Sequence, residues 1–145
     1  MTHVRSQIRA AVVAALSGLA TTGARVYPGR TRSLGEDHEP TLLIYTTDER
    51  AEIDAMGGIL LRRLTLVVDA QVVASGPPDD TLDQIAAEVE PAMILNPSLG
   101  GLAKWVLLTA TRTAIRADGK RHLGEVRLEY DIGYRTRENN PAMAV

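Results

Sequence analysis

The sequence predicts an α+β domain: a mostly antiparallel β-sheet with a long C-terminal hairpin, and two α-helices packed on one face. Residues 126–134 alternate apolar and polar side chains without interruption, and residues 105–115 are rich in β-branched side chains. Both patterns are typical of strands. Two further segments carry the apolar spacing of amphipathic helices. Strands outnumber helices and do not alternate with them regularly, so a parallel α/β sheet is not expected.

The C-terminal hairpin is the element that the sequence defines best. Its second strand has apolar residues on one face and polar residues or glycine on the other; the apolar positions are Val126, Leu128, Tyr130, Ile132 and Tyr134. Side chains along a strand point to opposite faces in turn, so one face is expected in a core and the other in water. The pair Asp118-Gly119 predicts the tight turn between the two strands, because it supplies a positive φ at low cost.

Three strands are expected before the hairpin. Residues 24–27 form a short strand candidate, and the continuous apolar run 41–46 fits a strand buried on both faces. A second long strand is expected over residues 60–73. Its face that includes Asp69 is the less apolar one, which indicates partial exposure or burial under another subunit. The polar segments 30–40 and 47–58 are interpreted as loops.

The first helix is expected from about residue 4 to residue 19. Its apolar residues recur at spacings of three and four, which forms a broad stripe suited to packing on the sheet. Thr2 is a candidate cap for its start, and Gly18 or Gly23 a candidate end.

The second helix is expected to begin at a cap formed by Asp79, Asp80 or Thr81, where early carboxylates also suit the positive end of the helix dipole. Pro91 cannot donate a backbone hydrogen bond, so this helix is expected to end or kink near Glu90.

The composition is that of one globular domain spanning residues 1–145. Apolar residues make up 45% and charged residues 23% of the chain, the net charge is −2, and there is no cysteine. These totals exclude a disulfide framework, a thiolate zinc site and the basic excess of a dedicated nucleic-acid binder. No apolar run is long enough for a membrane span. Residues 136–145 are expected to form a flexible tail unless a neighbouring subunit holds them.

The motifs of common catalytic sites are not found. Histidines stand at positions 3, 38 and 122, too far apart for a metal-binding helix pair, and neither a nucleophile elbow nor a phosphate-binding loop occurs. Paired acids lie in predicted loops, at a cap or on a helix, where solvation or capping explains them. We therefore predict no catalytic residue, no metal, no cofactor and no enzymatic activity.

Basic residues cluster at the hairpin turn, where Arg116, Lys120, Arg121 and His122 occur together. One interpretation is a solvated tip, since exposed charges usually do nothing specific. The other is a contact surface for an acidic partner or for DNA. Base stacking is not expected, because no aromatic residues are interleaved with the cations.

The length of the strands suggests self-association. Strands of about 13 residues run roughly 43 Å, whereas a compact chain of this size is about 38 Å across. The strand ends then project beyond the body, and exposed sheet edges are charged or covered in natural proteins. Covering by a neighbouring copy leads us to predict a homo-oligomer.

Several segments, taken in order, resemble the tail terminator (tail completion) proteins of long, non-contractile-tailed phages, the family of minor tail protein U. The resembling segments are residues 8–16, 24–30, 41–46, 64–69, 80–86, 90–93 and 128–134. The loop 30–40 and the segment 47–58 depart from the family pattern. The resemblance implies a structural virion protein: a homohexameric ring that caps the head-proximal end of the tail tube and stops its polymerisation.

The resemblance also implies partners. These are other copies of the chain, the tail tube protein and the head–tail connector protein, while DNA passes through the lumen without specific binding and no membrane is involved. The protein would act in the host cytoplasm during assembly and then in the virion. Under this hypothesis Arg30, Arg32, Arg116, Lys120 and Arg121 meet acidic surfaces of a neighbour or of the tube. Glu49, Glu52 and Asp54 face the lumen or the connector.

Two other classes remain open from the residues alone. One is a small cellular binding module, homo-oligomeric through its sheet edge and without catalytic activity. The other is an unrelated small enzyme.

Overall fold

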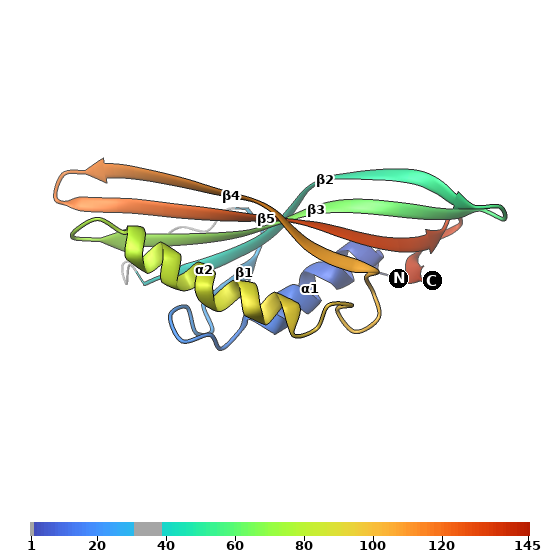
Figure 1. Cartoon of the computed structure of the whole chain (residues 1–145), viewed down its shortest axis with the longest axis horizontal. Helices are drawn as coiled ribbons and strands as arrows, with labels where there is room; N and C mark the ends of the chain where they lie inside the picture. Colours follow the sequence, from blue (N-terminus) through green and yellow to red (C-terminus); the bar gives the residue numbers. More distant parts are fainter. Residues whose placement is uncertain (1, 31–38) are drawn as a thin grey trace.

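The computed structural model describes residues 2–30 and 39–145, and Figure 1 shows both helices lying along one face of a long, twisted sheet. In chain order the elements are α1 (Val4–Leu16), β1 (Val26–Pro28), β2 (Thr41–Ala55), β3 (Ile59–Ala74), α2 (Asp79–Ile94), β4 (Trp105–Asp118), β5 (Arg121–Arg137) and β6 (Asn140–Ala144). The predicted α+β class is confirmed. So is the mostly antiparallel sheet.

The strands lie in the order β1-β2-β3-β5-β4, and β6 pairs with β5. Only β1 and β2 run parallel, and the other pairs are antiparallel. The two hairpins, β2–β3 and β4–β5, point to opposite ends of the molecule (Figure 1). The sheet is therefore a ribbon with one hairpin tip at each end.

The core lies between the helices and one face of the sheet. In α1 the four residues Val4, Ile8, Val12 and Leu16 are fully buried, since a spacing of four places them on one side of the helix. They join α2 and the even-numbered residues of β3 and β5 in one continuous cluster. The faces predicted for the two long strands are confirmed.

The long C-terminal hairpin is confirmed as β4 and β5. Asp118 pairs with Arg121, so Gly119 and Lys120 form the turn, and Gly119 has φ +63°. A two-residue turn of this kind requires the left-handed region, where glycine has no steric penalty.

The predicted loop over residues 47–58 is wrong. Strand β2 continues to Ala55 and pairs with β3 beyond the apolar run. Its outer half is polar because it projects from the body and meets water on its exposed sides, so the apolar content understates the strand. A bulge between Thr46 and Asp48 also breaks the alternation that would have revealed it.

Both predicted ends of the second helix differ from the structure. Helix α2 runs through Pro91 to Ile94, because Ala92 and Met93 are buried and their packing holds the last turn. Its N-cap is Pro78, without a side-chain hydrogen bond, so Asp79 and Asp80 lie in the first turn.

Helix α1 ends at Leu16 and is capped by His3 rather than Thr2: the Nδ1 of His3 accepts a hydrogen bond of 3.0 Å from the backbone N–H of Arg5. At the other end of the chain, where a frayed tail was expected, residues 140–144 form β6 beside the end of β5.

No helix of the described residues lies on the opposite face of the sheet. Leu43, Tyr45 and Val67 are nevertheless buried there and form a second, smaller apolar cluster with Tyr27 against it. We call this side of the sheet the open face. It combines apolar, acidic and basic side chains, as the less apolar face of the second long strand suggested.

A close contact on the open face explains Gly133. The ring of Trp105 lies over this glycine, and a Cβ added there would be 2.3 Å from ring atoms. The indole Nε1 donates a 3.1 Å hydrogen bond to Asp131, and Arg63 lies 5.4 Å from the ring centroid. These contacts hold the ring in place, so the glycine position has no room for a side chain.

We predict that Gly133→Ala lowers the free energy of unfolding by about 1–3 kcal/mol, as overpacking does. Gly76→Ala is the control, because nothing lies within 4 Å of a Cβ at that position. Urea unfolding of both variants measures the difference. Equal midpoints for Gly133→Ala and the unchanged chain would contradict the assigned contact.

Candidate assembly surfaces

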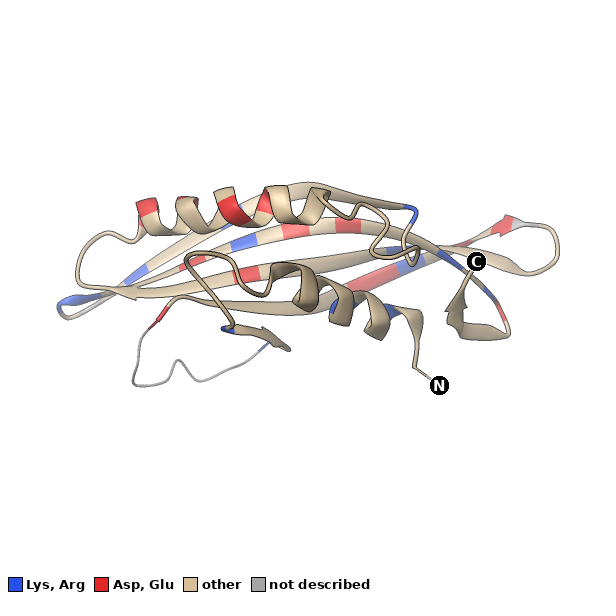
Figure 2. Ribbon diagram, turned by 90° about the horizontal axis from the view of Figure 1, so that it is seen from below, with Lys and Arg blue, Asp and Glu red and all other residues tan. Residues whose placement is uncertain are grey.

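The basic tip consists of Arg116, Lys120 and Arg121 at the end of the β4–β5 hairpin. All three side chains are exposed, and Figure 2 shows the blue of basic residues at this end of the ribbon. Within the described part of the chain, Arg116 and Lys120 form no ion pair. The structure therefore brings together the basic residues that the sequence placed at the turn.

The β2–β3 hairpin carries the predicted acidic residues at the opposite end. Asp54 lies 2.6 Å from the Nε of Arg135, and Glu52 lies 3.9 Å from the Nε of Arg63. Both carboxylates therefore have cationic partners within the chain. Ile53 and Met56 are exposed beside them, so this tip offers apolar as well as charged surface.

Arg30 and Arg32 are the two predicted interface arginines that follow β1, and the structure describes Arg30 alone. Arg30 is exposed; its guanidinium lies 5.5 Å from the ring centroid of Tyr45, and it donates a 3.3 Å hydrogen bond to the carbonyl of Thr46. Arg32 lies outside the described residues.

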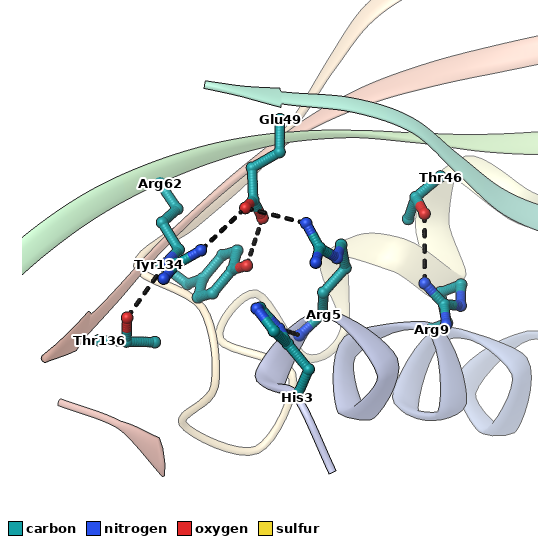
Figure 3. A network of polar contacts seen from close by, with 8 residues as sticks. All are labelled: His3, Arg5, Arg9, Thr46, Glu49, Arg62, Tyr134 and Thr136. Atoms are coloured by element: carbon teal, nitrogen blue, oxygen red, sulfur yellow. Dashed lines mark hydrogen bonds and ion pairs between the residues drawn. The ribbon is translucent and has the colours of Figure 1, made fainter. Parts of the chain in front are cut away.

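Glu49 is turned into the chain rather than toward a partner. Its side chain is only 9% exposed and accepts bonds of 3.1 Å from both Arg5 and Arg62, while the Tyr134 hydroxyl donates to its other oxygen (Figure 3). Arg62 also donates to Thr136 at 3.0 Å. This network joins α1, β2, β3 and β5 at the base of the β2–β3 hairpin.

The bulge in β2 explains why Glu49 lies on the helix side. Before the bulge, odd-numbered residues such as Tyr45 lie on the open face; after it, Glu49 pairs with Leu64, which belongs to the helix-side core. One extra residue thus moves a carboxylate under α1. The nearby His3 has a lowered pKa, first because of burial and then because of Arg5 and Arg62. This favours the neutral ring that accepts the capping bond.

A polar pocket of about 210 Å³ lies on the open face. Its lining residues come from β2, β3, β5 and the turn after β1: Arg30, Tyr45, Thr47, Val67, Asp69, Gln71, Glu125, Arg127 and Glu129. Asp69 is at its base and is 2% exposed. In the sequence, the less apolar face of the second long strand is the one feature that indicated this site.

Burial and the neighbouring Glu125 raise the pKa of Asp69 from 3.8 to about 7. Arg127 acts against this shift, but its Nε is 3.7 Å from Asp69 and only 2.8 Å from Glu125. The Tyr45 hydroxyl donates to Asp69 Oδ2 at 3.3 Å, whereas Oδ1 is buried and has no hydrogen-bond partner in the described part of the chain. Asp69 is therefore a poorly compensated buried carboxyl.

Residues 2–30 and 39–145 lack the features of two other kinds of site. No three His, Cys, Asp or Glu residues in these ranges are grouped to hold a metal ion. No helix there combines the length and apolar character required to cross a membrane. The charged groups described above lie on the sheet and at hairpin tips, an arrangement suited to a structural protein that assembles through its surfaces.

The family comparison agrees with that class. Residues 3–134 match the family of phage minor tail protein U, and the chain belongs to this family. It is thus a structural protein of a phage tail, found in the virion and associated with other virion components. The family indicates a structural role rather than a catalytic one, and a virion protein rather than a cellular module.

One solved structure supports the fold. It is of a protein without a functional name, with 24% sequence identity and a TM-score of 0.54, and the similarity covers 88% of this chain and 94% of that one. A chain of the virion of a native gene transfer agent particle has 16% identity and a TM-score of 0.46, covering 90% and 92%. A search of curated proteins finds no match.

We predict that Glu49→Gln lowers the free energy of unfolding by about 3 kcal/mol, because it leaves the largely buried Arg62 without its carboxylate. The share from Arg5 is smaller, since that side chain is 37% exposed and screened by water. Glu52 lies on the same strand, but its pair with Arg63 is exposed and long, at 3.9 Å. Glu52→Gln should therefore change the free energy of unfolding by no more than about 0.5 kcal/mol. Chemical denaturation compares the two, and equal losses would contradict the structural role of Glu49.

We predict that the stability of the chain contains a pH-dependent contribution from Asp69. Its folded pKa of about 7 exceeds the ordinary value of 3.8, so between these pH values the folded state binds a proton that the unfolded state releases. This contribution therefore decreases as pH rises from about 4 to 7. Its upper limit is a few kcal/mol, at about 1.4 kcal/mol per pKa unit.

Asp69→Asn should remove that contribution and raise stability at pH 8 relative to the unchanged chain. Urea unfolding at pH 5 and pH 8 measures it, with the exposed Asp83→Asn on α2 as the control. If Asp69→Asn keeps the full pH dependence of the unchanged chain, the assignment to Asp69 is wrong.

Proposed function

We propose that this chain is a tail terminator. Copies of it would form a ring, a hexamer by resemblance to the family, at the head-proximal end of the tail tube. The ring would stop polymerisation of the tube protein and provide the surface that the head–tail connector protein joins. Membership of the minor tail protein U family supports the general role, and the ring is the specific function proposed here.

The observation that carries this proposal is that the two ends of the ribbon differ. One end has cations, of which Arg116 and Lys120 form no ion pair in the described residues. The other end has exposed Ile53 and Met56 beside carboxylates. Unlike ends favour head-to-tail contacts, and such contacts close into a ring when their rotation closes.

Termination of a growing tube adds a second requirement. The ring must bind the tube on one side and reject a further copy on the other, so its two sides must differ in shape and charge. DNA must also pass through the lumen without being held. A strongly basic lining would bind phosphates by releasing counterions, and the net charge of −2 fits a passage without specific binding.

The residue roles follow from this arrangement. Arg30, Arg32, Arg116, Lys120 and Arg121 would meet acidic surfaces of a neighbour or of the tube. Glu52 and Asp54 would face the lumen or the connector. Glu49 would act indirectly by fixing the β2–β3 hairpin from inside the chain. Assembly would take place in the host cytoplasm, and the finished ring would lie at the head-proximal end of the tail.

We predict that Arg116→Glu, Lys120→Glu and Arg121→Glu, combined in one chain, yield tailless particles or overlong tails. Reversing these charges replaces attraction by repulsion at the contact of the basic tip. Negative-stain electron microscopy of particles from infected cells measures tail presence and length. The control is Lys104→Glu, a single charge reversal at an exposed position before β4, outside the basic tip. Normal, infectious virions from the triple variant would refute the proposed role of the tip.

A further inference from the structure

The carboxyl group of Asp69 is not fully hydrogen-bonded by the described part of the chain. Among the described residues, Asp69 Oδ1 is buried without a hydrogen-bond partner, and the contacts of Oδ2 are the 3.3 Å bond from Tyr45 and Arg127 at 3.7 Å. Buried polar groups in native proteins are nearly always paired. A buried carboxylate is costly unless a cation compensates it. The group therefore either stays protonated or receives a cation from outside.

The pocket also has the charge and the access that a cation requires. Among its described lining residues, three carboxyl groups (Asp69, Glu125 and Glu129) face two guanidinium groups. The Nε of Arg127 is closest to Glu125, at 2.8 Å, and Glu129 pairs with Arg112 at 3.2 Å. Asp69 is thus the carboxyl of this pocket with a buried acceptor that is not used. Exposed residues, among them Thr47, line the mouth of the pocket.

We propose that this pocket receives the basic tip of the β4–β5 hairpin from a second copy of the chain. The proposal rests on the ring described above and identifies one of its contacts. The tip fits because Arg116 and Lys120 form no ion pair among the described residues. The acidic β2–β3 tip is the weaker acceptor, since Asp54 and Glu52 already have arginine partners.

The tip of the same copy cannot fill the pocket. Asp69 pairs with Arg127, six residues along β5 from Arg121, which is roughly 20 Å at 3.3 Å per residue. Both lie in one paired sheet, so the hairpin would have to separate from β3 and fold back onto its own face. A second copy reaches the pocket without any rearrangement. The contact then joins two different surfaces, as a ring requires.

Disulfide cross-linking between copies tests this contact directly, because the chain has no cysteine of its own. One full-length chain carries Thr47→Cys at the pocket mouth and another carries Lys120→Cys at the tip. The two purified chains are mixed and oxidised, and the experiment is repeated with both chains co-expressed during phage assembly. Each condition should yield a covalent dimer. Adding Asp69→Asn to the Thr47→Cys chain should lower the yield at least tenfold.

The controls separate a specific contact from chance collisions. Lys104→Cys in place of Lys120→Cys should give little cross-link, and Asp83→Asn in place of Asp69→Asn should leave the yield unchanged. If tails assemble normally from the cysteine chains and no Thr47–Lys120 cross-link forms, the proposed contact is wrong while the terminator function stands. A cross-link that persists undiminished with Asp69→Asn also overturns the role of the pocket.

Tail length and infectivity of the triple charge-reversal variant test the part of the tip in tail termination separately from the cross-link. If the covalent dimer forms but the triple charge reversal of the tip leaves tail length and infectivity normal, the copies make the contact and the proposed role of the tip in tail termination is wrong. The two proposals can therefore fail separately.

Discussion

The pairing of β3 with β5 is the interaction on which the rest of this structure depends. It runs from Ile59 opposite Arg137 to Ala74 opposite His122 without a register shift. Because side chains alternate along both strands, an unbroken register places their even-numbered residues on the helix side of the sheet, and those in the middle of both strands join the core. A slip of one residue would turn that entire apolar set to the open face. The helices, the outer strands and the polar network all attach to this pair.

The strongest predictions from the sequence concerned this same pair of strands. The alternation at 126–134 predicted both the strand and its buried face, because every second residue there reports the same surroundings. The basic residues at 116–121 were predictable as a group for a similar reason, since a two-residue turn brings neighbours in the sequence together. Local patterns with local consequences were therefore recoverable.

The failures arose where distant pairing overrides local pattern. Residues 47–55 form a strand because β3 supplies the hydrogen bonds, although their polarity alone indicates a loop. The bulge before Asp48 then moves Glu49 to the helix side, where Arg5, Arg62 and Tyr134 surround it. The Asp69 pocket likewise exists only when β2, β3 and β5 lie side by side. No spacing within a single segment encodes either site.

The mismatch between strand and helix lengths explains why both ends of the molecule are open to partners. Strand β5 has 17 residues and spans roughly 56 Å at 3.3 Å per residue. Helices α1 and α2 have 13 and 16 residues, about 20 and 24 Å at 1.5 Å per residue. Even end to end they cover less than the strand, so the sheet ends extend as ribbons beyond the core, as Figure 1 shows.

At each end of the molecule the described sheet has only three long strands, because β3 and β5 pair along their full length and one long outer strand flanks them. The exposed edges of such ribbons invite further pairing. This chain stabilises one ribbon from within through Glu49 and its arginines, and it leaves the other ending in cations. The first ribbon is thereby a fixed projection. The second ends in exposed cations, of which Arg116 and Lys120 form no ion pair among the described residues. These are the charges that the proposed contact between copies would pair.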